Sequence, residues 1–197
     1  WLQNSNSNSL SNNVVNNNIT AGIWTGSSSD NYFDTNICDN NQGHGIVLNS
    51  NALNNTLSGN TTNSNGEIGV VVQSQASGNT ISGHTANNNS SGIRILNSNS
   101  NSLTNSTLTG NLNNGLWVES ASDTTITGNT ITESQNAGIL LISSNGNTVS
   151  GNDINGHTFW GIFLSNSSNQ TIYNNKFNNP SGNAGFEGSC ANNTWNT

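Results

Sequence analysis

The chain contains 197 residues with a formal net charge of −7, and only 6% of its residues are charged. Asn, Ser and Thr number 46, 30 and 21, so about half of the chain consists of three residue types that form helices poorly. This composition excludes an ordinary helical or α/β enzyme, and the presence of only two permanent cations, Arg94 and Lys176, excludes nucleic-acid binding driven by phosphate contacts.

A glycine followed by an aliphatic or aromatic residue recurs throughout the chain. The eight glycines lie 23 or 24 residues apart, at Gly22, Gly45, Gly69, Gly92, Gly115, Gly138, Gly161 and Gly185. A disordered chain of low complexity has no reason to keep such a period, so the period predicts a solenoid. No apolar run approaches the ~20 residues of a membrane-spanning helix, so we expect no membrane insertion.

Three short strands are predicted in each repeat. The first follows the glycine, because apolar residues stand one and three positions after it, as in residues 93–95, 116–118 and 139–141. The second is centred on Leu10, Phe33, Leu57, Ile81, Leu103, Ile126, Val149, Ile172 and Trp195. The third lies five residues later, at Val15, Cys38, Thr62, Ala86, Leu108, Ile131, Ile154 and Phe177. The pattern predicts an all-β, single-stranded, three-sided parallel β-helix (β-solenoid) of about eight rungs of 23–24 residues, forming one domain over residues 1–197.

Asparagine fills two of the predicted corners. One column contains Asn8, Asn31, Asn55, Asn79, Asn101, Asn147 and Asn193, with Thr124 and Gln170 as exceptions. The other contains Asn13, Asn36, Asn60, Asn129, Asn152 and Asn175, interrupted by His84 and Ser106. Asn tolerates left-handed backbone conformations, and stacked amides hydrogen-bond along an axis, so these columns are interpreted as structural.

Repeats such as GILLISSNGNTVSGNDI and GLWVESASDTTITGNTI resemble the right-handed parallel β-helix repeat of pectate-lyase-like proteins, NosD-like periplasmic proteins and many archaeal and bacterial surface proteins. The resemblance covers residues 10–195 and concerns core and corner positions. It implies the fold, while the family's members range from polysaccharide lyases and hydrolases to maturation proteins and structural envelope components.

The ionisable side chains show no catalytic or metal-binding grouping in the sequence. The carboxylates are spread over different rungs and sides: Asp30, Asp34, Asp39, Glu67, Glu119, Asp123, Glu133, Asp153 and Glu187. Glycosidases need two carboxyl groups roughly 5–10 Å apart, and metals need several converging ligands. His44, His84 and His157 occupy different columns and are expected to be surface or corner residues. We therefore expect no metal, no cofactor and no enzyme, with polysaccharide lyase or hydrolase activity left open.

The two cysteines, Cys38 and Cys190, lie about six rungs apart, or roughly 30 Å at the spacing of paired strands. That separation is too large for a disulfide within one chain. Cys38 is predicted to be a buried small hydrophobic residue. Cys190 is either a free thiol or a candidate for a bridge to another chain.

An outward column of the first strand is mostly apolar. It contains Trp24, Val47, Val71, Arg94, Trp117, Leu140 and Phe163, and Trp160 flanks it. An exposed apolar stripe of this kind marks an interaction surface, covered by another copy of the protein, by a loop of its own, or by sugar rings on its tryptophans. Protein contact is favoured, because aliphatic side chains fill gaps between chains better than they stack on sugars.

The predicted function is that of a structural cell-surface or extracellular protein that self-assembles into a sheath, layer or filament through its solenoid faces and ends. Neither end shows a capping segment, so the domain is expected to be a piece or repeat of a longer surface protein, or to stack on copies of itself. The alternative is a carbohydrate-binding or polysaccharide-degrading β-helix protein with a glycan partner. A minor alternative is ice binding through outward hydroxyls such as those of Thr125 and Thr127.

Overall fold

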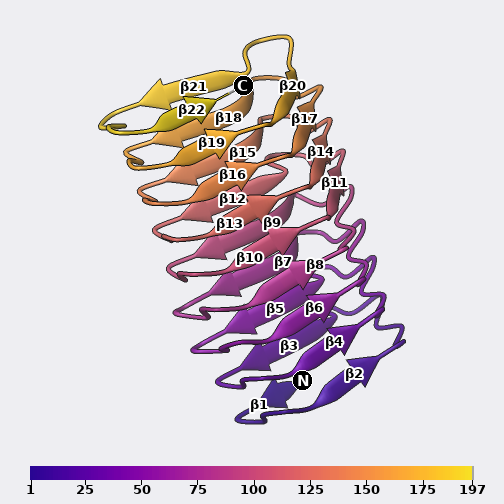
Figure 1. Cartoon of the computed structure of the whole chain (residues 1–197). Helices are drawn as coiled ribbons and strands as arrows, with labels where there is room; N and C mark the ends of the chain where they lie inside the picture. The colour runs from indigo at the N-terminus through magenta and orange to yellow at the C-terminus, as the bar shows by residue number, and fades with distance from the viewer. Residues whose placement is uncertain (197) are drawn as a thin grey trace.

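The computed structural model describes residues 1–196, so the last residue of the predicted domain lies outside the described part. The chain winds into a right-handed parallel β-helix of about eight turns with three sheets, as the repeat predicted (Figure 1). In the described residues no helix is long and apolar enough to cross a membrane.

Sheet A contains nine parallel strands, each of which pairs with the strand one turn away. Its strands are β1 (Leu2–Gln3), β3 (Ile23–Gly26), β5 (Ile46–Asn49), β7 (Ile68–Gln73), β9 (Ser91–Leu96), β12 (Leu116–Glu119), β15 (Ala137–Ile142), β18 (Trp160–Ser165) and β21 (Ala184–Glu187). These are the predicted first strands, and Ile93, Leu116 and Ile139 lie in one register and are fully buried.

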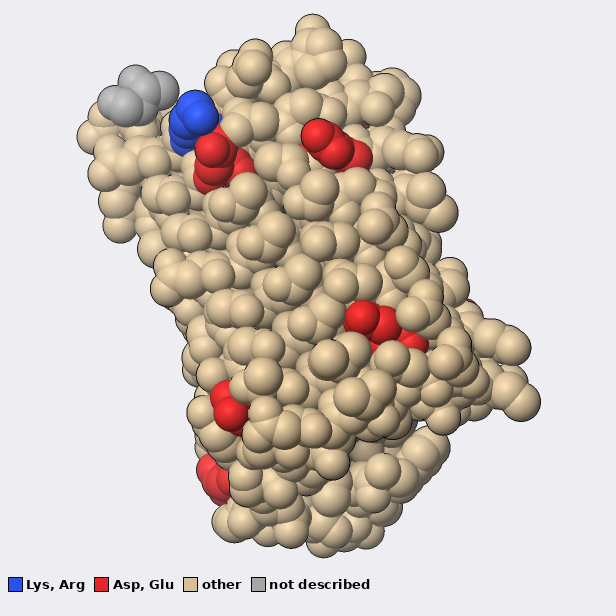
Figure 2. Space-filling view, turned by 90° about the vertical axis from the view of Figure 1, so that its right-hand side faces the viewer, with Lys and Arg blue, Asp and Glu red and all other residues tan. Residues whose placement is uncertain are grey.

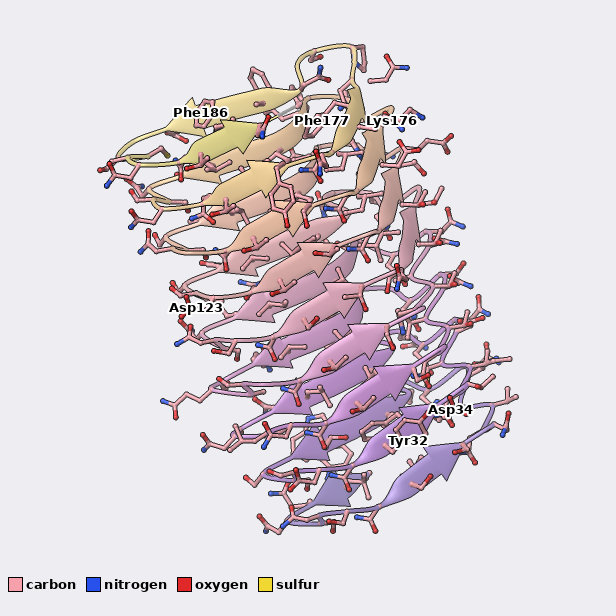
Figure 3. All side chains as sticks on the ribbon, in the orientation of Figure 1. Tyr32, Asp34, Asp123, Lys176, Phe177 and Phe186 are labelled. Carbon is pink, nitrogen blue, oxygen red and sulfur yellow. The ribbon has the colours of Figure 1, made fainter. Side chains whose placement is uncertain are left out.

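Sheet B also contains nine parallel strands, and they run across the view of Figure 1 in the direction opposite to those of sheet A. Its strands are β2 (Ser9–Ser11), β4 (Tyr32–Asp34), β6 (Thr56–Ser58), β8 (Thr80–Ser82), β10 (Ser102–Thr104), β13 (Thr125–Thr127), β16 (Thr148–Ser150), β19 (Thr171–Tyr173) and β22 (Thr194–Asn196). Its outward side chains are mostly Ser and Thr, interrupted near one end by Tyr32 and Asp34 (Figure 3). Tyr173 on β19 interrupts them near the other end. Ice binding by this face stays a prediction.

Sheet C has only four strands, so the third predicted strand forms in about half of the turns. They are β11 (Thr107–Thr109), β14 (Thr130–Thr132), β17 (Asp153–Asn155) and β20 (Lys176–Asn178), on the right of Figure 1. Earlier turns continue this side by single bridges, such as that between Ile37 and Thr61. The inward residues there are smaller, for example Ala86 in place of Leu108, so less apolar surface holds the chain in a strand.

The recurrent glycine that begins each turn of sheet A is required by close contact with the next turn. A Cβ atom on Gly45 would lie 2.5 Å from the carbonyl oxygen of Gly69, and one on Gly69 would lie 2.6 Å from that of Gly92. Gly92 stands in the same relation to Gly115, at 2.5 Å. The glycine therefore recurs once per turn because neighbouring backbones leave no room for a side chain at this position.

The predicted asparagine columns form hydrogen-bonded ladders inside the corners. The Oδ1 atom of Asn55 accepts from both the backbone N–H and the side-chain amide of Asn31, each at 3.0 Å, and the contact repeats between Asn55 and Asn79. A third ladder, which sequence reasoning missed, contains Asn18, Asn41, Asn65, Asn89 and Asn111. Its members are also 22 to 24 residues apart, so the same periodicity could have revealed it.

Two of the three histidines, His84 and His157, lie at corners, which is one of the two expected kinds of position, and both are fully buried. His84 interrupts the second ladder, and its Nε2 atom lies 2.8 Å from Oγ1 of Thr62. Burial lowers the pKa of His84 to about 3. His157 continues the third ladder: Nδ1 accepts from the N–H of Ser134, so the Nε2–H group donates to the carbonyl of Ile131, and burial lowers its pKa.

Both cysteines are free. Cys38 is fully buried, as predicted, and burial together with the charge of Asp39 raises its pKa to about 12. Cys190 is half-buried, and its Sγ atom lies 3.5 Å from the carbonyl oxygen of Leu164. Ser167, one turn earlier, makes the equivalent contact with Leu141 at 3.2 Å, so Cys190 occupies a structural column of small residues. A bridge from Cys190 to another chain stays a prediction.

Candidate functional site: the outer face of sheet A

The predicted outward column exists in register on sheet A but is not a continuous exposed stripe. Pairing aligns Trp24, Val47, Val71, Arg94, Trp117, Leu140 and Phe163. Val47 and Val71 are only 3% and 2% exposed, so the expectation of exposure was wrong for both. The aromatic members of the column are half-buried, as is Trp160 at the start of β18. The face therefore divides into separate sites.

A cleft of about 400 Å³ opens near the first turns of sheet A. Its walls include Trp1, Trp24, His44 and Glu67, and Val47 lies at its floor. The rings of Trp1 and Trp24 stack with centroids 4.3 Å apart and planes 19° from parallel. A side chain at Gly26 would collide with the Trp24 ring, so that glycine leaves space for the indole, and the stacked rings form an aromatic wall of the cleft.

His44 is held as a neutral hydrogen-bond donor in this cleft. Its Nδ1 atom accepts the backbone N–H of Ile68 at 3.2 Å, so the ring proton sits on Nε2, which is 3.0 Å from Oε2 of Glu67. Burial lowers the pKa of His44; Glu67 acts in the opposite direction, and Arg94 lowers the pKa further. The imidazole is therefore uncharged at neutral pH, and its orientation is fixed.

Arg94, Trp117 and Glu119 form a second cluster in the middle of the face. The Nη2 atom of Arg94 lies 2.7 Å from Oε2 of Glu119, and its guanidinium carbon lies 4.0 Å from the centre of the Trp117 ring. The Arg94 and Glu119 side chains are 25% and 29% exposed. The ion pair and the cation–π contact together fix the plane of the Trp117 ring.

A second cleft, of about 220 Å³, lies towards the last turns and is mainly apolar. It is lined by Leu140, Phe159, Trp160 and Phe163. The Trp160 and Phe163 rings are 6.1 Å apart, and Phe159 is 54% exposed. A side chain at Gly185 would collide with Trp160, so that glycine leaves space for the indole.

The carboxylates on this face do not form a catalytic pair. Glu67 precedes β7 and hydrogen-bonds to His44, whereas Glu119 ends β12 and binds Arg94. They lie at opposite ends of their strands, on turns separated by β9. Across residues 1–196, no three His, Cys, Asp or Glu side chains converge in a way that could hold a metal ion. The arrangement is suited to binding through aromatic faces and fixed hydrogen-bonding groups.

The sequence identified the aromatic members of this face but not their polar partners. Trp24, Trp117, Trp160 and Phe163 were predicted interface residues, and the structure divides them among three sites. The His44–Glu67 and Arg94–Glu119 contacts were missed. Their separations of 23 and 25 residues are close to one turn, so the repeat length could have suggested them.

Comparison with known families identifies the chain. A family profile described as "Periplasmic copper-binding protein (NosD)" matches residues 54–197, and one described as "Right handed beta helix region" matches residues 1–86. The chain belongs to the NosD family. No curated protein matches it significantly in sequence.

The NosD-family chain is similar in fold to the solved structures of two epimerases and a bacteriophage tailspike protein. The A-module of the mannuronan C-5 epimerase AlgE4 from Azotobacter vinelandii superposes with a TM-score of 0.84 at 19% identity, over 94% of this chain and 57% of that one. The periplasmic alginate epimerase AlgG superposes with a TM-score of 0.75 at 14% identity, over 89% of this chain and 47% of that one. The enzymatically active domain of bacteriophage CBA120 tailspike protein 2 superposes with a TM-score of 0.69 at 14% identity, over 90% of this chain and 34% of that one. At these identities the likeness concerns the fold.

Proposed function

We propose that this chain binds a polysaccharide along the outer face of sheet A. The observation that carries the proposal is the line of aromatic platforms at Trp24 on β3, Trp117 on β12 and Phe163 on β18. With paired strands ~4.8 Å apart, the first two are separated by about 19 Å and the last two by about 10 Å. Clefts lie at both ends of this line; the fixed imidazole of His44 belongs to the first cleft, and Arg94 lies between the two clefts.

Sugar rings match this surface better than a second protein chain does. A sugar ring has an apolar face and a rim of hydroxyls, which suit a flat aromatic wall beside fixed hydrogen-bonding groups. Burial of Val47 and Val71 removes the continuous aliphatic stripe on which lateral packing between chains was predicted. The names of the structural neighbours, which include alginate epimerases, support the same direction. Self-assembly receives no such support and stays a prediction from the sequence.

Binding without cleavage is the activity we propose. A glycosidase places two carboxyl groups roughly 5–10 Å apart across the scissile bond. On this face Glu67 and Glu119 stand at opposite strand ends, and each is engaged by a neighbouring side chain. We place the protein in the cell envelope or outside the cell, because the family description is periplasmic and an Asn-, Ser- and Thr-rich surface suits that setting.

The residues present do not fit the copper ion named in the family description. Copper is bound in proteins by thiolate, thioether and imidazole ligands. The chain has no Met, and Cys38, His84 and His157 are fully buried at separate positions. Both nitrogens of His44 are already hydrogen-bonded, to Ile68 and Glu67. The proposal therefore involves no copper.

The test is binding to a panel of soluble polysaccharides by affinity electrophoresis and calorimetry. Trp117→Ala should weaken binding by roughly tenfold or more, the loss typical of a central aromatic contact. Tyr173→Ala is the matched control, because Tyr173 is an exposed aromatic residue on sheet B. Assays for reducing ends and unsaturated products should stay negative. If no polymer binds, or if Trp117→Ala instead dissolves large homomeric assemblies, the proposal is wrong.

A further inference from the structure

We infer that the polysaccharide bound by the sheet A face is uncharged. This inference rests on the proposed function and names its ligand class. It departs from the structural neighbours, whose names specify mannuronan and alginate, polymers of uronic acids that carry one negative charge per sugar. The charged side chains of the face, and the partners that already bind them, decide this selectivity.

Among residues 1–196, the face offers a uronate no Lys or Arg side chain that lacks an acidic partner. The chain has two Lys or Arg residues, and Lys176 lies on sheet C beside Asp153, 3.3 Å away. Arg94 is the remaining one, and Glu119 already binds its guanidinium at 2.7 Å. Glu119 neutralises the charge of that guanidinium, so a ligand carboxylate that approached its remaining N–H groups would also be repelled by Glu119.

His44 does not supply the missing positive charge. A second ring proton would sit on Nδ1, which now accepts the backbone N–H of Ile68. Protonation would therefore set two donors against each other at 3.2 Å. The neutral ring keeps its one proton on Nε2, directed at Glu67, so the His44–Glu67 pair as a whole carries a negative charge.

The remaining charge on this face is negative. The face carries three carboxylates and one guanidinium, those of Glu67, Glu119, Glu187 and Arg94. The Glu67 side chain is 59% exposed at the rim of the first cleft. On the other faces of the described residues, Lys176 is the one Lys or Arg side chain, and it lies beside Asp153, so no basic patch offsets this charge. In Figure 2 acidic side chains are scattered over the flank, and the basic side chain in view lies beside an acidic one. With a net charge of −7, the molecule repels a polyanion over about a Debye length.

Uncharged sugars match the hydrogen-bond acceptors and the aromatic rings that the face offers. Their hydroxyls donate to the free oxygens of Glu67 and Glu119, and to the amide oxygen of Gln73 at the first cleft. Their apolar ring faces pack on the exposed rings of Trp1, which stacks on Trp24, and of Phe159, which lines the second cleft with Trp160. A polycation would need carboxylates repeated along its path, whereas Glu119 is neutralised by Arg94. The exposed Glu67 and Glu187 lie far apart, beside β7 and on β21, with four strands of sheet A between them.

The experiment compares uncharged β-glucan and mannan with alginate, polygalacturonate and chitosan, by affinity electrophoresis at low and high sodium chloride. The expected result is that an uncharged polymer binds best and that its affinity changes less than about twofold with salt, since no ion pair forms. Polyuronates should bind at least roughly tenfold more weakly than that polymer at low salt.

A pair of variants isolates the part played by Arg94. Glu119→Gln frees the guanidinium, so it should gain polyuronate binding that is lost at high salt. Glu187→Gln removes the same charge from the equivalent column of the last turn but leaves Arg94 paired, so it should keep the wild-type preference. Circular dichroism verifies that both variants fold.

The outcomes separate the two proposals. If the wild-type protein binds a polyuronate best, or binds chitosan best at high salt, the inference is overturned while polysaccharide binding stands. Equal gains of polyuronate binding in both variants also overturn it, because net charge rather than pairing of Arg94 would then govern selectivity. If no polymer of any class binds, the proposed function itself fails.

Discussion

At the scale of single residues, the corners are held by buried polar side chains that satisfy one another between turns. Where asparagines follow one another in a ladder, the amide oxygen accepts two hydrogen bonds from the turn before and the amide nitrogen donates to the turn after, as in Asn55 between Asn31 and Asn79. His84 breaks this pattern, because its Nδ1 atom has no hydrogen-bond partner within residues 1–196. Protonation of His84 would therefore place a buried, positively charged N–H group at Nδ1 without a hydrogen-bond acceptor.

His84 is expected to make the fold sensitive to acid. Burial lowers its pKa from 6.5 to about 3, so below about pH 6.5 the unfolded chain takes up a proton that the folded chain does not. The free energy of unfolding should fall as the pH decreases through this window, and His84→Asn should remove part of the decrease. Urea unfolding at about pH 7 and about pH 4.5 measures it. If the wild-type protein and His84→Asn lose the same free energy of unfolding between these two pH values, other groups cause the decrease.

The residue-scale details could be predicted only in part. Two asparagine columns and the burial of Cys38 follow from periodicity alone, because every turn repeats the same environment. The burial of His84 and His157 was missed, since a histidine at a corner looks like a surface residue until the ladder around it is known. The tautomer of His44 depends on contacts with Ile68 and Glu67 one turn later, which only coordinates reveal.

At the scale of elements, the strands were predictable where one face is buried against the core. Sheets A and B match the predicted first and second strands, because aliphatic residues alternate with outward ones in each turn. Sheet C was predicted in every turn but forms only from β11 onward, where Leu108, Ile131 and Ile154 fill the inward slot. The burial of Val47 was not predictable, because it depends on neighbouring side chains rather than on the strand pattern.

The glycine that begins each turn of sheet A should tolerate no side chain. In Gly92→Ala the new methyl group would lie 2.5 Å from the carbonyl oxygen of Gly115, so the backbone must shift, at an expected cost of about 3 kcal/mol. Gly83→Ala is the matched control. Gly83 has a φ of 58° but open space around it, so only backbone strain of about 1 kcal/mol is expected. Urea unfolding midpoints compare the two, and equal losses would refute the steric explanation.

At the scale of the whole molecule, the solenoid turns short local contacts into a long and regular surface. Successive turns place Trp24, Trp117 and Phe163 on one line, although they are far apart in sequence. The rod itself follows from the sequence period, whereas the division of its face into two clefts does not. That division arises from buried Val47 and Val71 and from the ion pair at Arg94.

A ligand that runs along the rod should bind more tightly as it becomes longer. From β3 to β18 there are six strand spacings, or about 29 Å, so short oligosaccharides reach one cleft while longer ones reach both. Calorimetry on oligosaccharides of increasing length should show affinity rising until this span is covered. Trp24→Ala and Phe163→Ala should each weaken binding of the polymer. A short oligosaccharide should lose affinity with only one of them, whereas a ligand that crosses the sheet would reach its full affinity at short length and ignore one of the two variants.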